Sequence, residues 1–183
     1  MKVIYAAASP TLQRWFWWLL LLNILFICFS RFYLKPLTSA EIIHFEVAKT
    51  VPVADGIVQD WKATGKYEKA QQSIYIDYLF ILLYTTGLAV SAAFFSRLTG
   101  HEILIRAGKG MSYLLAAAGI CDVIENVAMT RSLQGYITSW NAMLAYDMAA
   151  AKFSVIIICL LFLLVCILFY LANLLFEKRP KHF

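Results

Sequence analysis

Four long apolar blocks, separated by polar segments, dominate the pattern of residues along the chain. A transmembrane α-helix needs about 20 mostly apolar residues, and each block has roughly this length. The pattern predicts membrane-spanning helices at residues 15–33, 74–95, 111–130 and 153–176. We therefore expect an all-α fold, an integral membrane four-helix bundle that forms a single transmembrane domain over residues 1–183.

The segment between the first two blocks, residues 34–73, has the pattern of short helices rather than that of a linker. Thr38 followed three residues later by Glu41 is a capping-box signature, and the helix it starts is expected to run to about residue 49. Pro52 suits the first turn of a second short helix. We expect a small helical cap on the bundle, with its aromatic side chains packed down over the spans: Phe45 and Trp61.

The composition agrees with a membrane protein, since 62% of the residues are hydrophobic and 15% are charged. Basic residues in short loops mark the cytoplasmic side. They gather in the N-terminal tail, around residues 97–110 and in the C-terminal tail: Lys2, Arg14, Arg97, Arg106, Lys109, Lys178, Arg179 and Lys181. We therefore expect both termini in the cytoplasm and the cap outside. The formal charge of +5 suits anionic membrane lipid, and no basic run with interleaved aromatics predicts a nucleic-acid partner.

Polar and ionisable residues inside the predicted spans are the most informative feature of the sequence. They are Asp77 in the second span, Asp122, Glu125 and Asn126 in the third, and Lys152 at the start of the fourth. Such residues are expensive to keep in hydrocarbon and mark function by default. Because neighbouring spans run in opposite directions, all of them fall in the outer half of the bundle, with Glu125 about 8 Å below the outer end of its helix.

The spacing of these residues predicts that they share one interior. Asp122, Glu125 and Asn126 are three and four residues apart, which places them on one helix face. Tyr84 lies seven residues after Asp77, and Cys159, Cys166 and Asn173 follow Lys152 at the same interval. We predict a site lined by six residues: Asp77, Tyr84, Asp122, Glu125, Asn126 and Lys152. Within it, the Lys152 ammonium is expected to pair with Glu125 or Asp122.

Catalytic and metal-binding signatures are missing from the sequence. The three histidines, His44, His101 and His182, lie outside the predicted spans, which disfavours a His-based hydrolase or an intramembrane metalloprotease. No cysteine pair has metal-ligand spacing. We therefore expect no catalytic residue, no metal and no cofactor.

Part of the pattern resembles that of small bacterial four-helix integral membrane proteins to which no function is assigned. The residues that carry the resemblance cover most of the chain from about residue 40 onward: Phe45-Glu46-x-Ala48, Trp61, Ile76-Asp77-Tyr78-Leu79-Phe80, Tyr84, Asp122-x-x-Glu125-Asn126 and Lys152-Phe153. It implies a multi-pass protein of the bacterial inner membrane and adds no mechanism. The topology is also similar to that of four-helix membrane binders and isomerases of sterols, but a shared topology does not assign a function.

Three functional hypotheses follow from the predicted polar pocket. The leading hypothesis is non-enzymatic: the pocket binds, or binds and moves, a small amphiphile, a cation or a proton. The second is an intramembrane enzyme that uses Glu125 or Asp122 as an acid–base group on a lipid-like substrate. The third is an accessory subunit of a membrane complex, which would direct its charges outward. Pairing of these charges only to fix helix packing remains the structural alternative.

Overall fold

The computed structural model describes residues 9–177, and over this range the chain forms six helices and no strand. Four of the helices are long and apolar enough to cross a membrane: α1 Pro10–Tyr33, α4 Tyr67–Leu98, α5 Glu102–Leu133 and α6 Ser139–Glu177. Two short helices stand between the first and the second of them: α2 Ser39–Glu46 and α3 Val51–Ala63. The predicted all-α fold and the multi-pass membrane architecture are confirmed. Four of the basic residues used for the orientation lie outside the described residues: Lys2, Lys178, Arg179 and Lys181.

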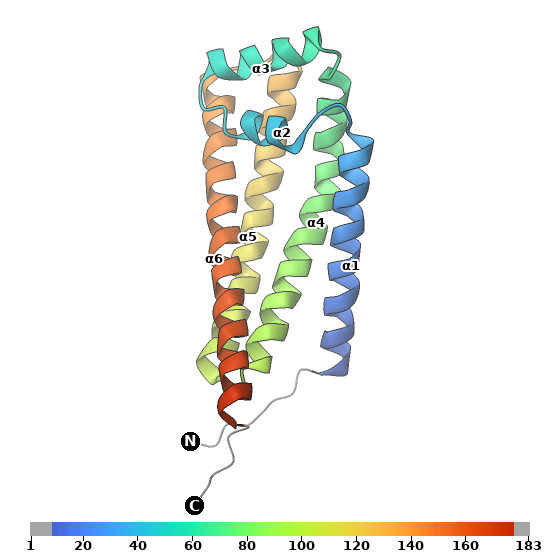
Figure 1. Ribbon diagram of the computed structural model, residues 1–183. Coiled ribbons are helices and arrows are strands. Elements are labelled where there is room, and N and C mark those ends of the chain that lie inside the picture. Colours follow the sequence, from blue (N-terminus) through green and yellow to red (C-terminus); the bar gives the residue numbers. More distant parts are fainter. Residues whose placement is uncertain (1–8, 178–183) are drawn as a thin grey trace, which may run out of the picture.

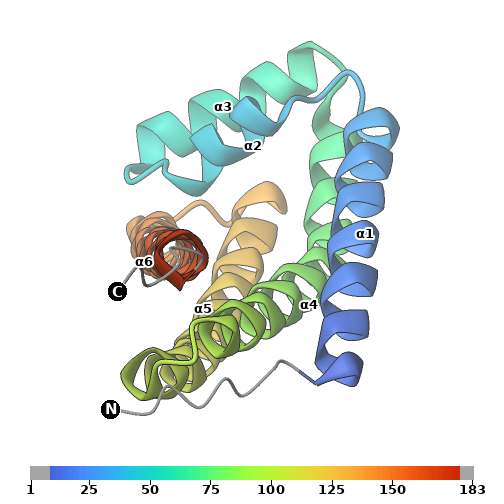
Figure 2. The same ribbon diagram turned by 60° about the horizontal axis from the view of Figure 1, so that its bottom comes forward.

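The long helices run side by side, and α2 and α3 lie across one end of them (Figure 1). Helices α4, α5 and α6 contact one another, whereas α1 packs chiefly against α4 and stands at the side of the bundle (Figure 2). Asn23 contributes to this contact, because its side-chain amide donates a hydrogen bond of 3.0 Å to the Leu83 carbonyl oxygen of α4. The interior is therefore formed mainly by α4, α5 and α6.

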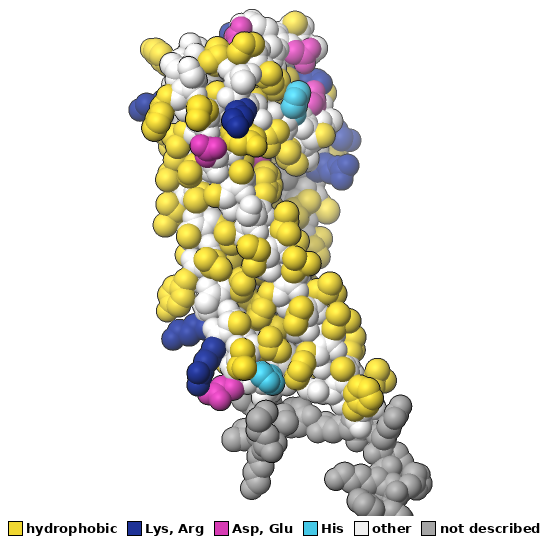
Figure 3. Space-filling view, turned by 90° about the vertical axis from the view of Figure 1, so that its left-hand side faces the viewer, with side chains coloured by type: hydrophobic (Ala, Val, Ile, Leu, Met, Phe, Trp, Pro, Cys, Tyr) yellow, Lys and Arg dark blue, Asp and Glu magenta, His cyan; other side chains and the backbone are white. Residues whose placement is uncertain are grey.

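The apolar surface of these helices matches a bilayer. On the face drawn in Figure 3, hydrophobic side chains cover the middle of the bundle, and charged side chains gather towards its two ends. Large apolar residues are exposed along all four long helices, for example Leu25, Leu82, Ile120 and Leu164. Exposed apolar surface of this extent marks contact with lipid or with another protein, and its presence on all four long helices fits a surrounding of lipid.

The cap matches the prediction in two respects, the start of α2 at the Thr38 capping box and the packing of its aromatic side chains. The Thr38 hydroxyl accepts a hydrogen bond from the Glu41 backbone N–H at 3.3 Å, while the Glu41 carboxylate accepts one from the Thr38 N–H at 2.9 Å. Phe45 and Trp61 are buried, with their rings 5.1 Å apart in an edge-to-face arrangement. The predicted packing of both rings is confirmed.

Several helix boundaries differ from the prediction. Helices α1, α4 and α5 begin at Pro10, Tyr67 and Glu102, before the predicted starts of their spans at residues 15, 74 and 111. Helix α2 ends at Glu46 rather than near residue 49, because the chain must reverse direction before Thr50, which has the extended conformation of a helix N-cap. Helix α6 begins at Ser139, well before residue 153. The hydroxyl of Thr138 precedes its first turn and accepts a hydrogen bond of 3.2 Å from the Asn141 backbone N–H, as the Thr38 hydroxyl does at the start of α2. Hydropathy marks only the part of a helix inside hydrocarbon, and α6 continues beyond it.

Candidate functional site

The Lys152 ammonium of α6 lies at the centre of a group of carboxylates. Its Nζ is 2.7 Å from Asp122 Oδ1 and 2.9 Å from Glu125 Oε2, both on α5. A third carboxylate, Glu46 of the cap helix α2, lies 3.3 Å from the same nitrogen. The predicted pairing of Lys152 with Asp122 or Glu125 is confirmed, and the ammonium in fact contacts both. Together with Tyr84, we call these residues the Lys152 cluster: Glu46, Tyr84, Asp122, Glu125 and Lys152.

Tyr84 connects this cluster to α4. Its hydroxyl donates a hydrogen bond of 2.8 Å to Asp122 Oδ2, so that the two oxygens of Asp122 accept from different helices. Burial is nearly complete, since Glu125 has an exposed fraction of 0% and Lys152 one of 5%. Because water is excluded, each of these ion pairs and hydrogen bonds acts in a medium of low dielectric constant.

The other two predicted residues form a separate contact beside the cluster. The Asn126 amide donates a hydrogen bond of 2.7 Å to Asp77 Oδ2, which joins α5 to α4. The Asn126 side chain is buried, and its Oδ1 has no hydrogen-bond partner among the described residues. The structure therefore brings all six predicted residues to the cap end of the interior, in two groups that share helices α4 and α5.

Glu46 is the member of the cluster that the sequence analysis missed as a site residue. It lies outside the apolar spans, where a glutamate is ordinarily solvated, and the sequence analysis named it only within the motif Phe45-Glu46-x-Ala48. One signal could have found it: Glu46 follows Ile42 by four residues and so shares the stripe of α2 that faces the bundle. Only the placement of the cap over α5 and α6 brings this carboxylate to Lys152.

The two glutamates of α2 have opposite electrostatic environments. Burial raises the pKa of Glu46 to about 7, and this effect exceeds the opposing attraction of Lys152. By contrast, the hydrogen bonds from Lys66 and Thr38 lower the pKa of Glu41 to about 2. The Lys66 ammonium lies 2.6 Å from the Glu41 carboxylate near the surface of the cap.

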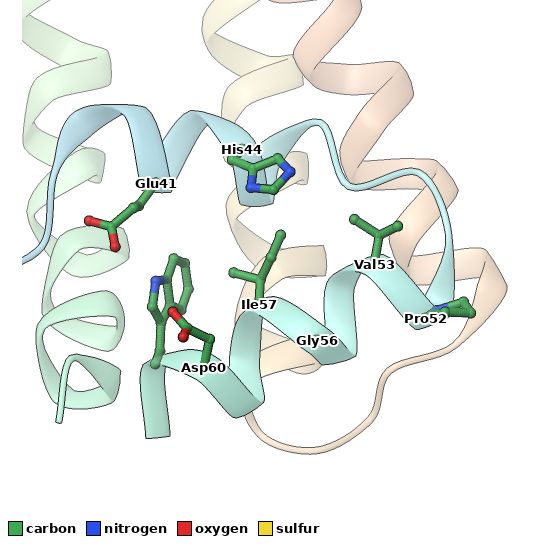
Figure 4. A pocket seen from close by; sticks show the side chains of 8 residues that line it. Glu41, His44, Pro52, Val53, Gly56, Ile57 and Asp60 are labelled. Atoms are coloured by element: carbon green, nitrogen blue, oxygen red, sulfur yellow. The ribbon is translucent and has the colours of Figure 1, made fainter. Parts of the chain in front are cut away.

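The polar residues meet as a packed cluster, whereas the sequence analysis expected them to line a pocket. A cavity of about 320 Å³ lies instead within the cap, between α2 and α3 (Figure 4). A smaller one of about 10 Å³ lies between α4 and α5 near Gln71 and Leu133. No member of the Lys152 cluster and neither Asp77 nor Asn126 lines either cavity. The charged side chains around Lys152 are themselves almost fully buried.

The charges of the cluster are unbalanced. Arg131, the other basic residue near this end of α5, is exposed and forms no ion pair with a carboxylate in the described range. The donor set does not suit a metal ion either, because no group of three or more His, Cys, Asp and Glu residues in the described range could hold one. Lys152 is thus the cation that the described residues supply to three carboxylates.

Comparisons with known protein families, with curated protein sequences and with solved structures find no match to this chain.

Proposed function

We propose that this membrane protein binds protons in the Lys152 cluster. The observation that carries the proposal is the charge imbalance: Glu46, Asp122 and Glu125 surround one ammonium, and Asp77 is within electrostatic reach. A carboxylate taken out of water without a partner costs several kcal/mol. Protons on the acids that Lys152 does not neutralise remove this cost and need no additional space.

The closed packing of the cluster supports a proton over a larger ligand. An amphiphile needs a cavity, and the two described cavities lie away from these residues. A metal ion needs several ligands around one point, and the carboxylate oxygens are already directed at Lys152 and Tyr84. A proton needs only one carboxylate oxygen.

The half of the interior away from the cap supports binding rather than passage across the membrane. Beyond Tyr84 and Lys152, the buried residues of the described helices are apolar or carry only a hydroxyl or thiol, for example Ala92, Ser96, Thr99, Leu115 and Cys159. Proton transport requires a continuous chain of acid–base groups or water, and among the described residues no buried carboxylate, histidine or lysine extends the cluster into this half. The cluster is therefore a site that exchanges protons with the cap end.

The other two hypotheses draw less support. An enzyme would need its acid–base carboxylate to face a substrate, whereas Asp122 and Glu125 face Lys152 from within a packed interior. An accessory subunit was expected to direct its charges outward, and the charged groups of the cluster are buried inside the bundle.

The decisive experiment is a pH titration of the carboxyl groups by infrared difference spectroscopy on protein reconstituted in lipid. We expect a band from buried protonated carboxylic acid at neutral pH, and we expect it to decrease in Glu125→Gln and Glu46→Gln. The matched control is Asp147→Asn, because Asp147 is an exposed acid on the same helix as Lys152. The proposal fails if wild-type protein shows no such band. It also fails if added Na⁺ at constant pH removes the band, because the ligand would then be a cation.

We further propose that the protein lies in a bacterial inner membrane with the cap outside and both termini in the cytoplasm. The support is the group of basic residues around the turn between α4 and α5: Arg97 in the last turn of α4, and Arg106 and Lys109 in the first turns of α5. The test is labelling of single cysteine replacements in intact cells with an impermeant thiol reagent. We expect labelling at the exposed Lys62 of the cap and none at Arg106 until the membrane is permeabilised. Labelling at Arg106 in intact cells would reverse the orientation.

A further inference from the structure

Glu46 is distinctive because it joins the buried cluster from outside the membrane-spanning helices. It lies on α2, and charged groups face it from three helices: Lys152 from α6, Asp122 and Glu125 from α5, and Asp77 from α4. The ionisable residues of the neighbouring helix α3, Asp55, Asp60 and Lys62, are exposed. The electrostatic balance of Glu46 is therefore set almost entirely by the bundle.

The backbone of the cap approaches the long helices at few places, and apolar side chains make most of the attachment. Helices α2 and α3 contact α4 and α6 far less than the long helices contact one another. The apolar part of the attachment comes from Phe45, Val58 and Trp61, which pack with Met129 and Leu133 of α5. Glu46 directly follows Phe45, so its charge state acts at the centre of this attachment.

Among the three carboxylates around Lys152, Glu46 is the most loosely held. Its distance to Nζ is 3.3 Å, compared with 2.7 Å for Asp122 and 2.9 Å for Glu125. It is also the most exposed of the three, at 8%. Because Asp122 and Glu125 already contact the ammonium at shorter distances, a negative charge on Glu46 gains little attraction and repels two other carboxylates.

We propose that Glu46 carries the exchangeable proton of the cluster and that binding of this proton closes the cap over the bundle. This inference rests on the proposed function and adds the regulation of the same site. A protonated Glu46 is neutral and can stay buried beside Lys152. An ionised Glu46 is stabilised by water, which it reaches when α2 moves away from α5 and α6.

Thermodynamic linkage gives the direction of this switch. In the closed cap, burial raises the pKa of Glu46 from 4.5 to about 7. In an open cap, where the side chain is hydrated, the pKa returns towards 4.5. The closed cap then binds the proton more tightly than the open cap, so the closed state loses stability as the pH rises from about 4.5 to about 7. Above that window, opening is easiest.

The test is hydrogen exchange of the α2 backbone amides, measured by mass spectrometry on the full chain in lipid nanodiscs between pH 6 and pH 8. After correction for the intrinsic pH dependence of exchange, we expect the wild-type opening constant to rise about tenfold. This is the change that follows from pKa values of about 7 closed and 4.5 open. Glu46→Gln mimics the protonated side chain, and its opening constant should not change with pH.

Glu41→Gln provides the matched control, because Glu41 lies on the same helix but pairs with Lys66 and has a pKa of about 2. The opening constant of Glu41→Gln is expected to differ from that of the wild type by the same factor at every pH, so the tenfold rise between pH 6 and pH 8 remains. A wild-type opening constant that is flat with pH would overturn the switch, and so would a rise that persists in Glu46→Gln. The infrared band is read on the same samples. If the infrared band titrates but the opening constant of α2 does not change with pH, the switch is wrong and the proposed function stands. If the band is missing, the proposed function itself is wrong.

Discussion

Ion pairs join the helices at the cap end of the bundle, whereas small side chains join them at the opposite end. At the cap end, α4, α5 and α6 meet through Tyr84, Asp122 and Lys152. At the opposite end, a Cβ atom added to Gly108 would lie 2.9 Å from the Ala92 carbonyl oxygen, so that α4 and α5 approach closely. Buried hydroxyls there bond only to nearby backbone, as Thr99 does to the Ser96 carbonyl oxygen at 2.6 Å.

The contrast shows that this fold does not need buried charges to pack. Close approach of helices through small residues is the ordinary means of association in lipid. A buried ion pair is by itself weak evidence for stability, because desolvation offsets the attraction between its charges. The cap end therefore carries an electrostatic cost that the opposite end avoids. This difference is the reason to assign a function to the Lys152 cluster.

The largest effect is expected from removal of the ammonium. Lys152→Met leaves buried carboxylates without their partner, and it should lower the free energy of unfolding by about 3–5 kcal/mol. Thermal or denaturant unfolding in detergent measures the loss. If Lys152→Met is as stable as the wild type, the cluster is held by something other than this ion pair.

A double-mutant cycle sharpens this prediction. Glu125→Gln removes one of the carboxylates that Lys152 contacts, so it should recover part of the loss in the Lys152→Met background. Strictly additive effects would mean that the two residues do not communicate. As a control, the effects of Gly108→Ala and Lys152→Met on the free energy of unfolding should be additive, because the two positions lie in different halves of the bundle.

An intermediate effect is expected at the opposite end. Gly108→Ala places a methyl group against the Ala92 carbonyl oxygen and the Ser96 side chain, which should destabilise the protein by about 1–3 kcal/mol through overpacking. The matched control is Gly110→Ala on the same helix, because no atom lies within 4 Å of its added Cβ. Unfolding in detergent should show a loss only at Gly108 and no dependence of that loss on pH. Equal effects at the two glycines would remove the contrast between the halves.

The smallest effect is expected in the cap at Glu41. Its ion pair with Lys66 is partly exposed, so Glu41→Gln should reduce the stability of the cap by at most about 1 kcal/mol at neutral pH. Because the folded-state pKa of about 2 lies below the ordinary value of 4.5, this contribution is present above about pH 4.5 and is lost as the pH falls towards 2. Exchange of α2 amides measured at pH 7 and pH 3 checks both statements. If the difference in α2 amide exchange between Glu41→Gln and the wild type is larger at pH 3 than at pH 7, the ion pair with Lys66 is not the cause of the stabilisation.

The sequence by itself determined the four spans, the helical cap and the six polar residues that gather at the cap end. It could do so because each follows from local pattern: the length of an apolar block, the capping box at Thr38 and the three- and four-residue spacing of Asp122, Glu125 and Asn126. These patterns depend on neighbours along one helix, which the sequence contains directly.

Only the tertiary structure decided which groups share Lys152 and whether the site is open. Glu46 reaches the ammonium across more than a hundred residues of chain, through the way α2 lies over α5 and α6. No periodicity within α2 can specify that contact, because it depends on the angle at which the cap crosses the bundle. The closed packing of the cluster has the same origin, since the fit of side chains from four helices is a property of their arrangement and not of any one segment.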